Sequence, residues 1–231
     1  MDEPGPGEAP AAENAQARQA ALEALEAGRR LFARPCRFVA GVAAPDGLPA
    51  PTLPEIAFAG RSNVGKSSLV NALTWRRALA RTSNTPGRTR ELNFFDLDSR
   101  LMLVDLPGYG YAAASKQKIK AWTRLAESYL RGRPTLQRVC LLLDARRGIT
   151  SADEPVMAAF DQSAVSFLAV LTKCDKLAPE ALGAQVAAIE AALAAHVAAY
   201  PSLIATSART GDGIAALRSH LAALATAERI G

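Results

Sequence analysis

The residues best suited to chemistry form one short run that fits the phosphate-binding pattern G-x-x-x-x-G-K-[ST]: Gly60, Arg61, Ser62, Asn63, Val64, Gly65, Lys66 and Ser67. The two glycines allow backbone torsions and a close approach that a Cβ would block. The loop amides are then expected to form a nest for an anion, completed by the N-terminus of the following helix. Lys66 would reach the β- and γ-phosphates, and the Ser67 hydroxyl would ligate Mg²⁺. The pattern predicts that the chain binds a nucleotide.

A second motif follows a predicted strand and consists of Asp105, Leu106, Pro107 and Gly108. An Asp at such a strand end can hold a Mg²⁺-bound water, and the Gly amide can meet a γ-phosphate. In isolation, Asp-x-x-Gly is an ordinary turn. Its place after a strand that follows a phosphate-binding loop favours the phosphate site.

Two further segments bear on the base, namely Thr172, Lys173, Cys174 and Asp175, and then Thr206, Ser207 and Ala208. A carboxylate at Asp175 can accept two hydrogen bonds from the N1–H and exocyclic amine of guanine, while the Lys173 stem covers the base. Adenine presents no such pair of donors, and a site built for them rejects it by a large factor. The later segment could supply an amide to the guanine oxygen. Together they favour GTP over ATP.

Residues 81–90 are rich in hydroxyls and turn formers, as expected for a segment that orders around a γ-phosphate and Mg²⁺ and relaxes after hydrolysis. Thr82, Thr85 and Thr89 are all candidate metal ligands. Their spacing does not separate them.

The order of predicted elements indicates an α/β fold with a doubly wound, mainly parallel sheet and helices on both faces, as in P-loop GTPases. One antiparallel edge hairpin is expected, turning at Asp98-Ser99. The predicted strands are Phe38–Val42, Glu55–Ala59, Leu92–Leu97, Leu101–Asp105, Arg138–Leu143, Ser166–Leu171 and Leu203–Thr206. The predicted helices are Lys66–Leu73, Ser115–Leu130, Ala152–Gln162, Pro179–Ala198 and Ile214–Ala227.

Composition divides the 231 residues into a GTP-binding domain over 29–231 and an acidic, Ala/Pro-rich extension over 1–28. The extension is expected to be disordered, with partial helix over Ala11–Leu31. It holds six acids and one base, a net charge of −5, so the remaining chain carries +10 and the whole chain +5. Such a domain suits a polyanion such as RNA, although a merely solvated basic surface is the alternative.

The remaining features predict a cytoplasmic protein without a membrane partner, and we expect it to be a monomer. The apolar runs are too short to span a bilayer, and the N-terminus lacks the features of a secretory signal. Cys36, Cys140 and Cys174 form no metal-ligand pattern, and their odd number argues against a disulfide framework.

Taken together, these motifs closely resemble the EngB (YihA/YsxC) family of bacterial, translation-associated P-loop GTPases. The matching stretches are Gly60–Ser68, Thr85–Thr89, Leu92–Phe95, Asp105–Tyr111, Thr172–Asp175 and Trp122, within a resemblance from about Ala33 to Ala227. The resemblance implies Mg²⁺-dependent GTP hydrolysis and a role in maturing the large ribosomal subunit. It also implies Thr89 as the switch ligand of Mg²⁺, with Gly87, Arg88, Thr89, Arg90 and Glu91 along the nucleotide. At Arg90 and Glu91 the family more often has an uncharged pair.

Hydrolysis is expected to rest on positioning and electrostatics. The residues assigned to it are Lys66, Asn63, Thr89 and Gly108, with Mg²⁺ held by Ser67, Thr89 and, through water, Asp105. Tyr109 stands where Ras-like proteins have a water-orienting Gln, which predicts slow intrinsic turnover. Asn63 matches a position that helps hold K⁺ in related GTPases; the alternative is that it caps a loop turn.

The expected partners are GTP or GDP and the large ribosomal subunit or its precursor, with rRNA as the contacted polyanion. A regulatory module that binds GTP and GDP but hydrolyses negligibly is the main alternative. A third hypothesis, that the chain is the G domain of a membrane transporter, is disfavoured because no predicted segment is long and apolar enough to span a membrane. The basic residues flanking the expected switches favour nucleotide-dependent contact with RNA; they are Arg76, Arg77, Arg81, Arg88, Arg90, Lys116, Lys118, Lys120 and Arg124.

Overall fold

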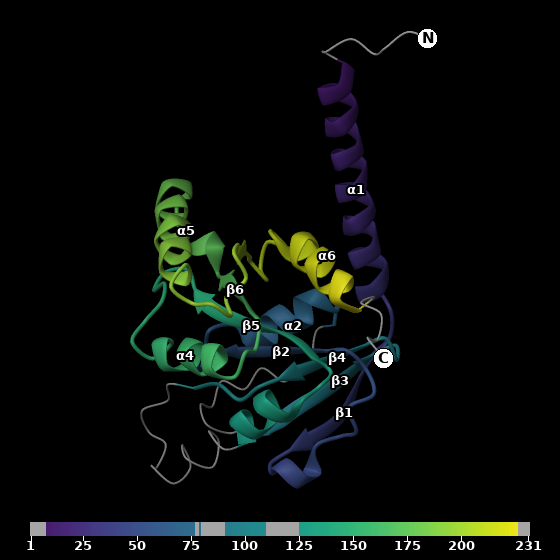
Figure 1. Ribbon diagram of the computed structural model, residues 1–231, viewed down its shortest axis with the longest axis vertical. Helices are drawn as coiled ribbons and strands as arrows, with labels where there is room; N and C mark the ends of the chain where they lie inside the picture. Colours follow the sequence, from purple (N-terminus) through teal and green to yellow (C-terminus); the bar gives the residue numbers. More distant parts are fainter. Residues whose placement is uncertain (1–7, 77–78, 80–90, 110–124, 226–231) are drawn as a thin grey trace.

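The computed structural model describes residues 8–76, 79, 91–109 and 125–225. Within them, seven strands form one sheet in the order β1-β3-β4-β2-β5-β6-β7 (Figure 1). Strand β3 pairs antiparallel with both β1 and β4, and the other described pairs are parallel. The strands are β1 (Cys36–Val42), β2 (Glu55–Gly60), β3 (Leu92–Leu97), β4 (Leu101–Asp105), β5 (Leu136–Asp144), β6 (Phe167–Thr172) and β7 (Ile204–Ala205).

Helices cover both faces of this sheet, so the predicted doubly wound α/β fold is confirmed. The helices are α1 (Glu8–Phe32), α2 (Lys66–Leu73), α4 (Glu154–Gln162), α5 (Pro179–Leu193) and α6 (Ile214–Ala225), with a helical stretch over 125–132 and 3₁₀ turns η1 (Pro45–Gly47) and η2 (Cys174–Lys176). The predicted 179–198 helix ends early, at Leu193. Part of the predicted 115–130 helix lies outside the described residues.

The central strands read as unbroken apolar runs because both of their faces are buried. All residues of β2, β4 and β6 are buried. In β2, Ile56 and Phe58 pack with α1, α2 and α6, whereas Ala57 and Ala59 face the cluster that includes Met157 of α4. This two-sided burial fixes the carboxyl ends of the parallel strands at one edge, where the loops carrying the predicted motifs emerge.

The predicted hairpin joins β3 and β4 at Asp98-Ser99, as the sequence indicated. Asp98 and Ser99 both have positive φ, 53° and 54°, in a turn of three residues, 98–100, that is closed by a hydrogen bond from Arg100 N to the Leu97 carbonyl at 3.1 Å. The hairpin does not form the edge of the sheet, because β1 pairs antiparallel with β3 along its outer side. The predicted strand Phe38–Val42 corresponds to β1, which begins two residues earlier, at Cys36, but its position outside the hairpin was not predicted.

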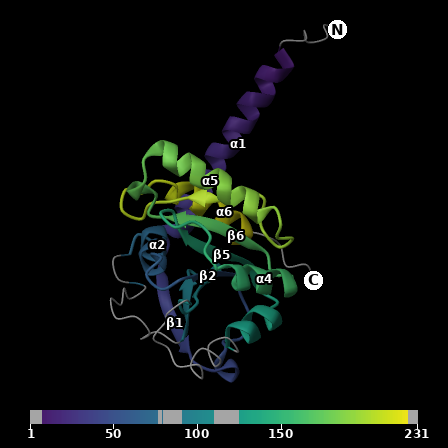
Figure 2. The ribbon, with the colours of Figure 1, turned by 90° about the vertical axis from the view of Figure 1, so that its left-hand side faces the viewer.

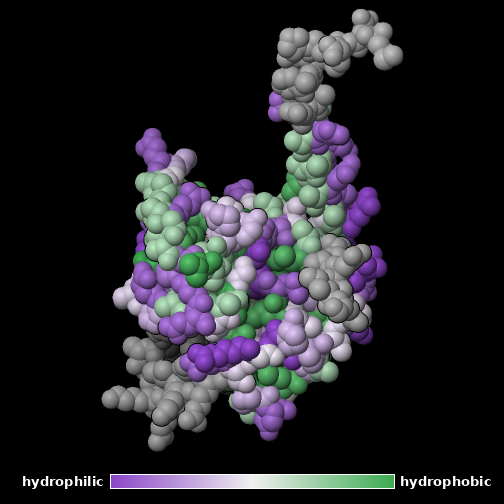
Figure 3. Space-filling view, viewed as in Figure 1, coloured by the Kyte–Doolittle hydropathy of each residue, from purple (hydrophilic) through white to green (hydrophobic). Residues whose placement is uncertain are grey.

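The N-terminal extension differs from its prediction. The sequence predicted an extension over residues 1–28 that is disordered apart from partial helix over Ala11–Leu31, whereas α1 is helical from Glu8 to Phe32, so the boundary predicted at residue 28 falls inside a helix. Only its last turns contact the body: Gly28, Leu31 and Phe32 are buried at helical spacing, and α1 packs on α6. Its earlier turns project from the body (Figures 1 and 2) and show hydrophilic residues on one side and weakly hydrophobic ones on the other (Figure 3). This short contact explains why no long apolar stripe marks the helix.

Replacing Gly28 should detach α1. A Cβ at this position would lie 2.5 Å from the Ser219 backbone nitrogen and 2.7 Å from the Arg218 carbonyl carbon, so a side chain cannot fit without moving backbone. We expect Gly28→Val to lower stability by about 1–3 kcal/mol and to raise hydrogen exchange along α1. Ala24→Val, on an exposed position of the same helix, carries the same β-branched cost and is the control. Equal exchange in the two variants would contradict the packing role of Gly28.

Candidate nucleotide site at the carboxyl edge of the sheet

The phosphate-binding loop joins the end of β2 to the start of α2. Gly60 closes β2, and a Cβ there would lie 2.9 Å from Val64 Cγ1 and 3.1 Å from the Leu142 carbonyl oxygen. Gly65 has φ 109° and Asn63 has φ 65°, so the loop turns through two left-handed residues before the helix begins at Lys66. Gly60 therefore lies where there is no room for a side chain, and Gly65 lies where the backbone adopts a left-handed conformation that favours glycine.

The loop is held from both sides by hydrogen bonds. On one side, Ser62 N donates to the Tyr109 carbonyl at 3.0 Å, and Tyr109 N donates to the Gly60 carbonyl at 3.3 Å. On the other side, Thr172 Oγ1 donates to the Val64 carbonyl at 2.7 Å. Because the C=O and N–H of a trans peptide point in opposite directions, the Gly65 amide is turned away from Thr172. This orientation suits a nest of amides around an anion.

Lys66 and Asp105 form an ion pair beside this loop. Both side chains are largely buried, and Asp105 is held there because β4 pairs with β2 through Phe58. Ser67, the next residue of α2, is half-buried. The described residues contain no cluster of three or more His, Cys, Asp or Glu that could hold a metal alone. A hydroxyl and one carboxylate near a phosphate site fit Mg²⁺, which takes few protein ligands and completes its shell with phosphates and water.

Asp175 lies in a cavity of about 260 Å³ at the same edge. Ser207 Oγ donates to its Oδ1 at 2.8 Å, while its Oδ2 is buried and accepts no hydrogen bond from the described residues. Arg209 Nε lies 3.3 Å from Oδ2. The Ser207 hydrogen bond, with Lys176 and Arg209 nearby, holds the pKa of Asp175 below its usual value against the opposing effect of burial. The cavity is lined by Gly65, Ser68, Leu69, Thr172, Lys173, Asp175, Lys176, Thr206, Ala208 and Arg209.

The loops after β6 and β7 are tied together below this cavity. Thr206 Oγ1 donates to the Leu171 carbonyl at 2.7 Å, and Cys174 N donates to the Thr206 carbonyl at 3.1 Å. Burial raises the pKa of the Cys174 thiol, so this side chain is a packed neighbour of the site and no nucleophile. The structure thus brings together the two segments that the sequence assigned to the base.

Lys173 connects the two halves of the site. Its Nζ donates to the Asn63 carbonyl of the phosphate loop at 2.6 Å and lies 3.0 Å from Asp144 Oδ2. Asp144 also accepts two hydrogen bonds from the Arg146 guanidinium, and these contacts lower its pKa despite burial. Neither Asp144 nor Arg146 was predicted from the sequence. The available signal was position, because Asp144 ends a buried strand at the same edge as Asp105.

The position of Glu91 in the structure differs from the predicted one. The resemblance implied that it lies along the nucleotide, but its carboxylate lies against Gly41 of β1. Strands β3 and β4 separate β1 from β2 and its loop. The expected switch residues Gly87, Arg88, Thr89 and Arg90, the other candidate ligands Thr82 and Thr85, and Trp122 lie outside the described residues.

Three features of this site define a nucleotide-binding protein of the P-loop GTPase class. They are a glycine-rich loop between a buried strand and a helix, a strand-end Asp beside the loop lysine, and a carboxylate in a cavity that could hold a base. The family described as "50S ribosome-binding GTPase" matches residues 55–173. The chain is 58% identical over 211 residues to "Probable GTP-binding protein EngB" of Rhodospirillum rubrum, covering 89% of this chain and 91% of that protein. The protein of the same name from Gluconobacter oxydans is 55% identical, covering 87% and 88%. The chain therefore belongs to the EngB family of GTP-binding proteins.

Solved structures agree with the fold. A crystal structure of a probable GTP-binding protein EngB matches with a TM-score of 0.59 at 21% identity, covering 75% of this chain and all of that one. Aquifex aeolicus Era bound to GDP and AlF4⁻ matches with a TM-score of 0.61 at 20% identity, covering 75% of this chain and 57% of that one. Among the described helices, none has both the length and the apolar character needed to cross a membrane.

Proposed function

We propose that this protein is a Mg²⁺-dependent GTPase that hydrolyses GTP to GDP and phosphate and acts as a switch in large ribosomal subunit assembly. The observation that carries the proposal is the Asp175 carboxylate, buried in a cavity that adjoins Gly65 of the phosphate loop. An ionised carboxylate offers only acceptors, so it pairs with the two donors of guanine and not with adenine.

Each residue of the phosphate loop would have a role in binding the phosphates. The backbone over Gly60–Ser67, with Arg61, Ser62 and Val64 in its free positions, would surround the phosphates, and Lys66 would neutralise their charge. Ser67 and Thr89 would hold Mg²⁺ directly and Asp105 through water, while the Gly108 amide would meet the γ-phosphate. Bound Mg²⁺ would supply neutralisation of the charge that develops on the transferred phosphoryl group. Leu106 and Pro107 hold Gly108 at the strand end.

Intrinsic turnover should be slow, about 10⁻⁴ s⁻¹ as for unassisted Ras. The Tyr109 hydroxyl donates to Asp153 at 2.7 Å in a buried contact, so the side chain is turned into the core and does not orient a water. Asn63 has an exposed side chain and is proposed to help hold K⁺. Single-turnover rates in KCl and NaCl test both points: equal rates remove the K⁺ role. A rate orders of magnitude higher without a partner contradicts slow turnover, and none at all favours the regulatory module.

A ribosomal partner is supported by the matching family's description as 50S ribosome-binding and by the basic charge outside residues 1–28. Sedimentation of the protein with large-subunit precursors, in GDP and in a non-hydrolysable GTP analogue across a salt series, tests the switch. We expect co-sedimentation only with the analogue, weakening as salt rises. Equal sedimentation in the two nucleotides would contradict a switch. The proposal places the protein in the cytoplasm as a monomer.

A further inference from the structure

A buried polar cluster lies between the phosphate loop and α4. Its centre is Asp153, which is only 1% exposed and immediately precedes α4. Asp153 Oδ1 accepts from the Tyr109 hydroxyl at 2.7 Å. Its Oδ2 accepts from Thr150 N at 2.8 Å and from Thr150 Oγ1 at 2.6 Å. Arg61 of the phosphate loop reaches the same Thr150 hydroxyl at 3.4 Å.

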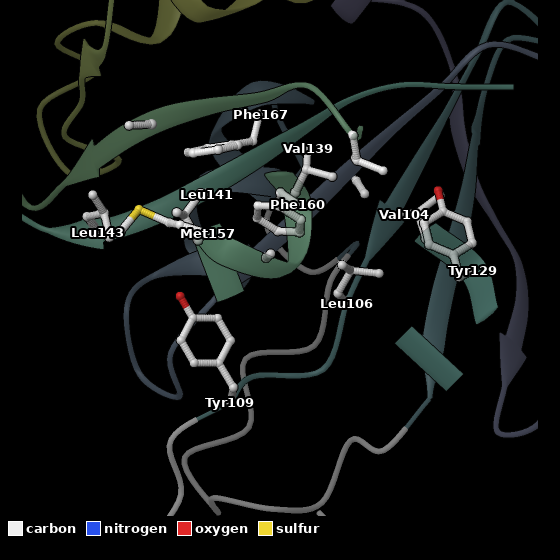
Figure 4. Packing of buried hydrophobic residues seen from close by; sticks show 14 of the residues in the cluster. Val104, Leu106, Tyr109, Tyr129, Val139, Leu141, Leu143, Met157, Phe160 and Phe167 are labelled. Atoms are coloured by element: carbon white, nitrogen blue, oxygen red, sulfur yellow. The ribbon is translucent and has the colours of Figure 1, made fainter. Parts of the chain in front are cut away.

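Tyr109 is therefore held at both its backbone and its side chain. Its N–H and C=O bond to Gly60 and Ser62 of the phosphate loop. Its ring is buried among the apolar residues packed against α4, with the hydroxyl on the side where Met157 lies (Figure 4). Burial beside Asp153 raises the pKa of Tyr109 well above its usual value, so the hydroxyl stays protonated and donates. A hydrogen bond to a buried carboxylate is among the stronger kinds.

This double attachment fixes the residue before it. A Cβ on Gly108 would lie 3.0 Å from the Ser62 backbone nitrogen, so the Gly108 backbone packs directly on the phosphate loop. On its other side, the Leu106 amide donates to the Phe58 carbonyl at 3.0 Å. Gly108 is thus bracketed between two anchored residues. A loss of either anchor would let its amide move relative to the loop.

We propose that Asp153, acting through Tyr109, is a positioning residue that holds Gly108 at the phosphate loop and so sets the affinity for GTP relative to GDP. The inference rests on the proposed function, in which the Gly108 amide meets the γ-phosphate. GDP lacks that phosphate, so the affinity for GDP should not depend on the hydrogen bond between Tyr109 and Asp153. A merely structural role for the cluster would lower stability without favouring either nucleotide.

The test compares Tyr109→Phe with a matched control, Tyr129→Phe. Tyr129 is also buried, and its hydroxyl donates to the Glu55 carboxylate at 2.9 Å, but Glu55 begins β2 at the opposite end of the strand from the phosphate loop. Dissociation constants for GDP and for a non-hydrolysable GTP analogue are measured by equilibrium titration. We expect Tyr109→Phe to raise the dissociation constant of the analogue about tenfold and that of GDP by less than about twofold. Tyr129→Phe should leave the ratio of the two constants unchanged.

A second variant, Asp153→Asn, removes the charge at the centre of the cluster without changing its shape. It should shift the ratio in the same direction, and the double variant should shift it by less than the sum of the two effects. An unchanged ratio in Tyr109→Phe, tighter analogue binding, or the same shift in Tyr129→Phe would overturn the inference. Failure of the unmodified protein to bind the analogue would instead refute the proposed function.

Discussion

Asp175→Asn should reverse the base preference of the site from guanine to xanthine. The carboxylate offers two acceptors to the guanine N1–H and exocyclic amine, whereas an amide offers one acceptor and a donor. Xanthine carries a carbonyl where guanine carries that amine. Ser207 Oγ lies 2.8 Å from Oδ1 and favours an amide oxygen there, which puts the NH₂ group in the place of Oδ2. Oδ2 is the buried oxygen that accepts no hydrogen bond within the described residues.

The expected change is a loss of GTP affinity of about 10²- to 10⁴-fold, with XTP binding more tightly than GTP. Competition titration with the two nucleotides measures both quantities. Asp212→Asn is the matched control, since Asp212 is an exposed carboxylate in the following turn whose Oδ2 accepts from Thr210 Oγ1 at 2.6 Å. Retained GTP affinity in Asp175→Asn would refute the assignment of the base site.

The sequence predicted the elements that carry the site more closely than the contacts within it. The helix Lys66–Leu73 and the strands Leu92–Leu97 and Leu101–Asp105 have the bounds that the pattern gave. Apolar runs and the glycine-rich loop were sufficient there, because both report local conformation and burial. The contact of Lys173 with the Asn63 carbonyl joins residues 110 positions apart, and no spacing rule connects them.

The cluster at Asp153 was missed for a related reason. Asp153 precedes a helix in the sequence, a position where an Asp ordinarily accepts hydrogen bonds from the first helical turn. In the structure it makes no such capping bond, and its carboxylate instead binds Tyr109 and Thr150. The sequence predicted a helix from Ala152, and α4 begins two residues later, at Glu154. Its connection to the phosphate loop depends on the packing of α4 against the sheet.

Arg133→Met should cause a large loss of stability, although Arg133 lies outside the site. Arg133 and Glu55 are 6% and 1% exposed at the side chain, and Arg133 Nε lies 2.8 and 2.9 Å from the two carboxylate oxygens. Within the described part of the chain, removing the guanidinium leaves the buried carboxylate with the Tyr129 and Thr135 hydroxyls as its remaining side-chain partners. We expect a loss of about 3–5 kcal/mol in the free energy of unfolding, measured by urea titration.

Arg37→Met is the control for this prediction. Arg37 also pairs with a carboxylate, Asp96, at 3.2 Å, but its side chain is 73% exposed. An exposed pair of this kind contributes about 0–1 kcal/mol. Similar losses in the two variants would mean that burial of the Arg133 pair does not determine its contribution. Nucleotide affinity should be preserved in both proteins, because neither arginine lies at the carboxyl edge of the sheet.

The contacts of Thr172 and Lys173 with the phosphate loop also bear on when its shape is established. Both side chains bond to loop carbonyls, those of Val64 and Asn63, through groups of the protein itself. The conformational entropy of the loop is therefore lost when the chain folds and not when a nucleotide arrives. A preorganised loop leaves more of the interaction energy available for affinity. Thr172 and Lys173 belong to the base segment and also hold the phosphate loop in shape. A substitution of either residue should therefore weaken the binding of both the base and the phosphates.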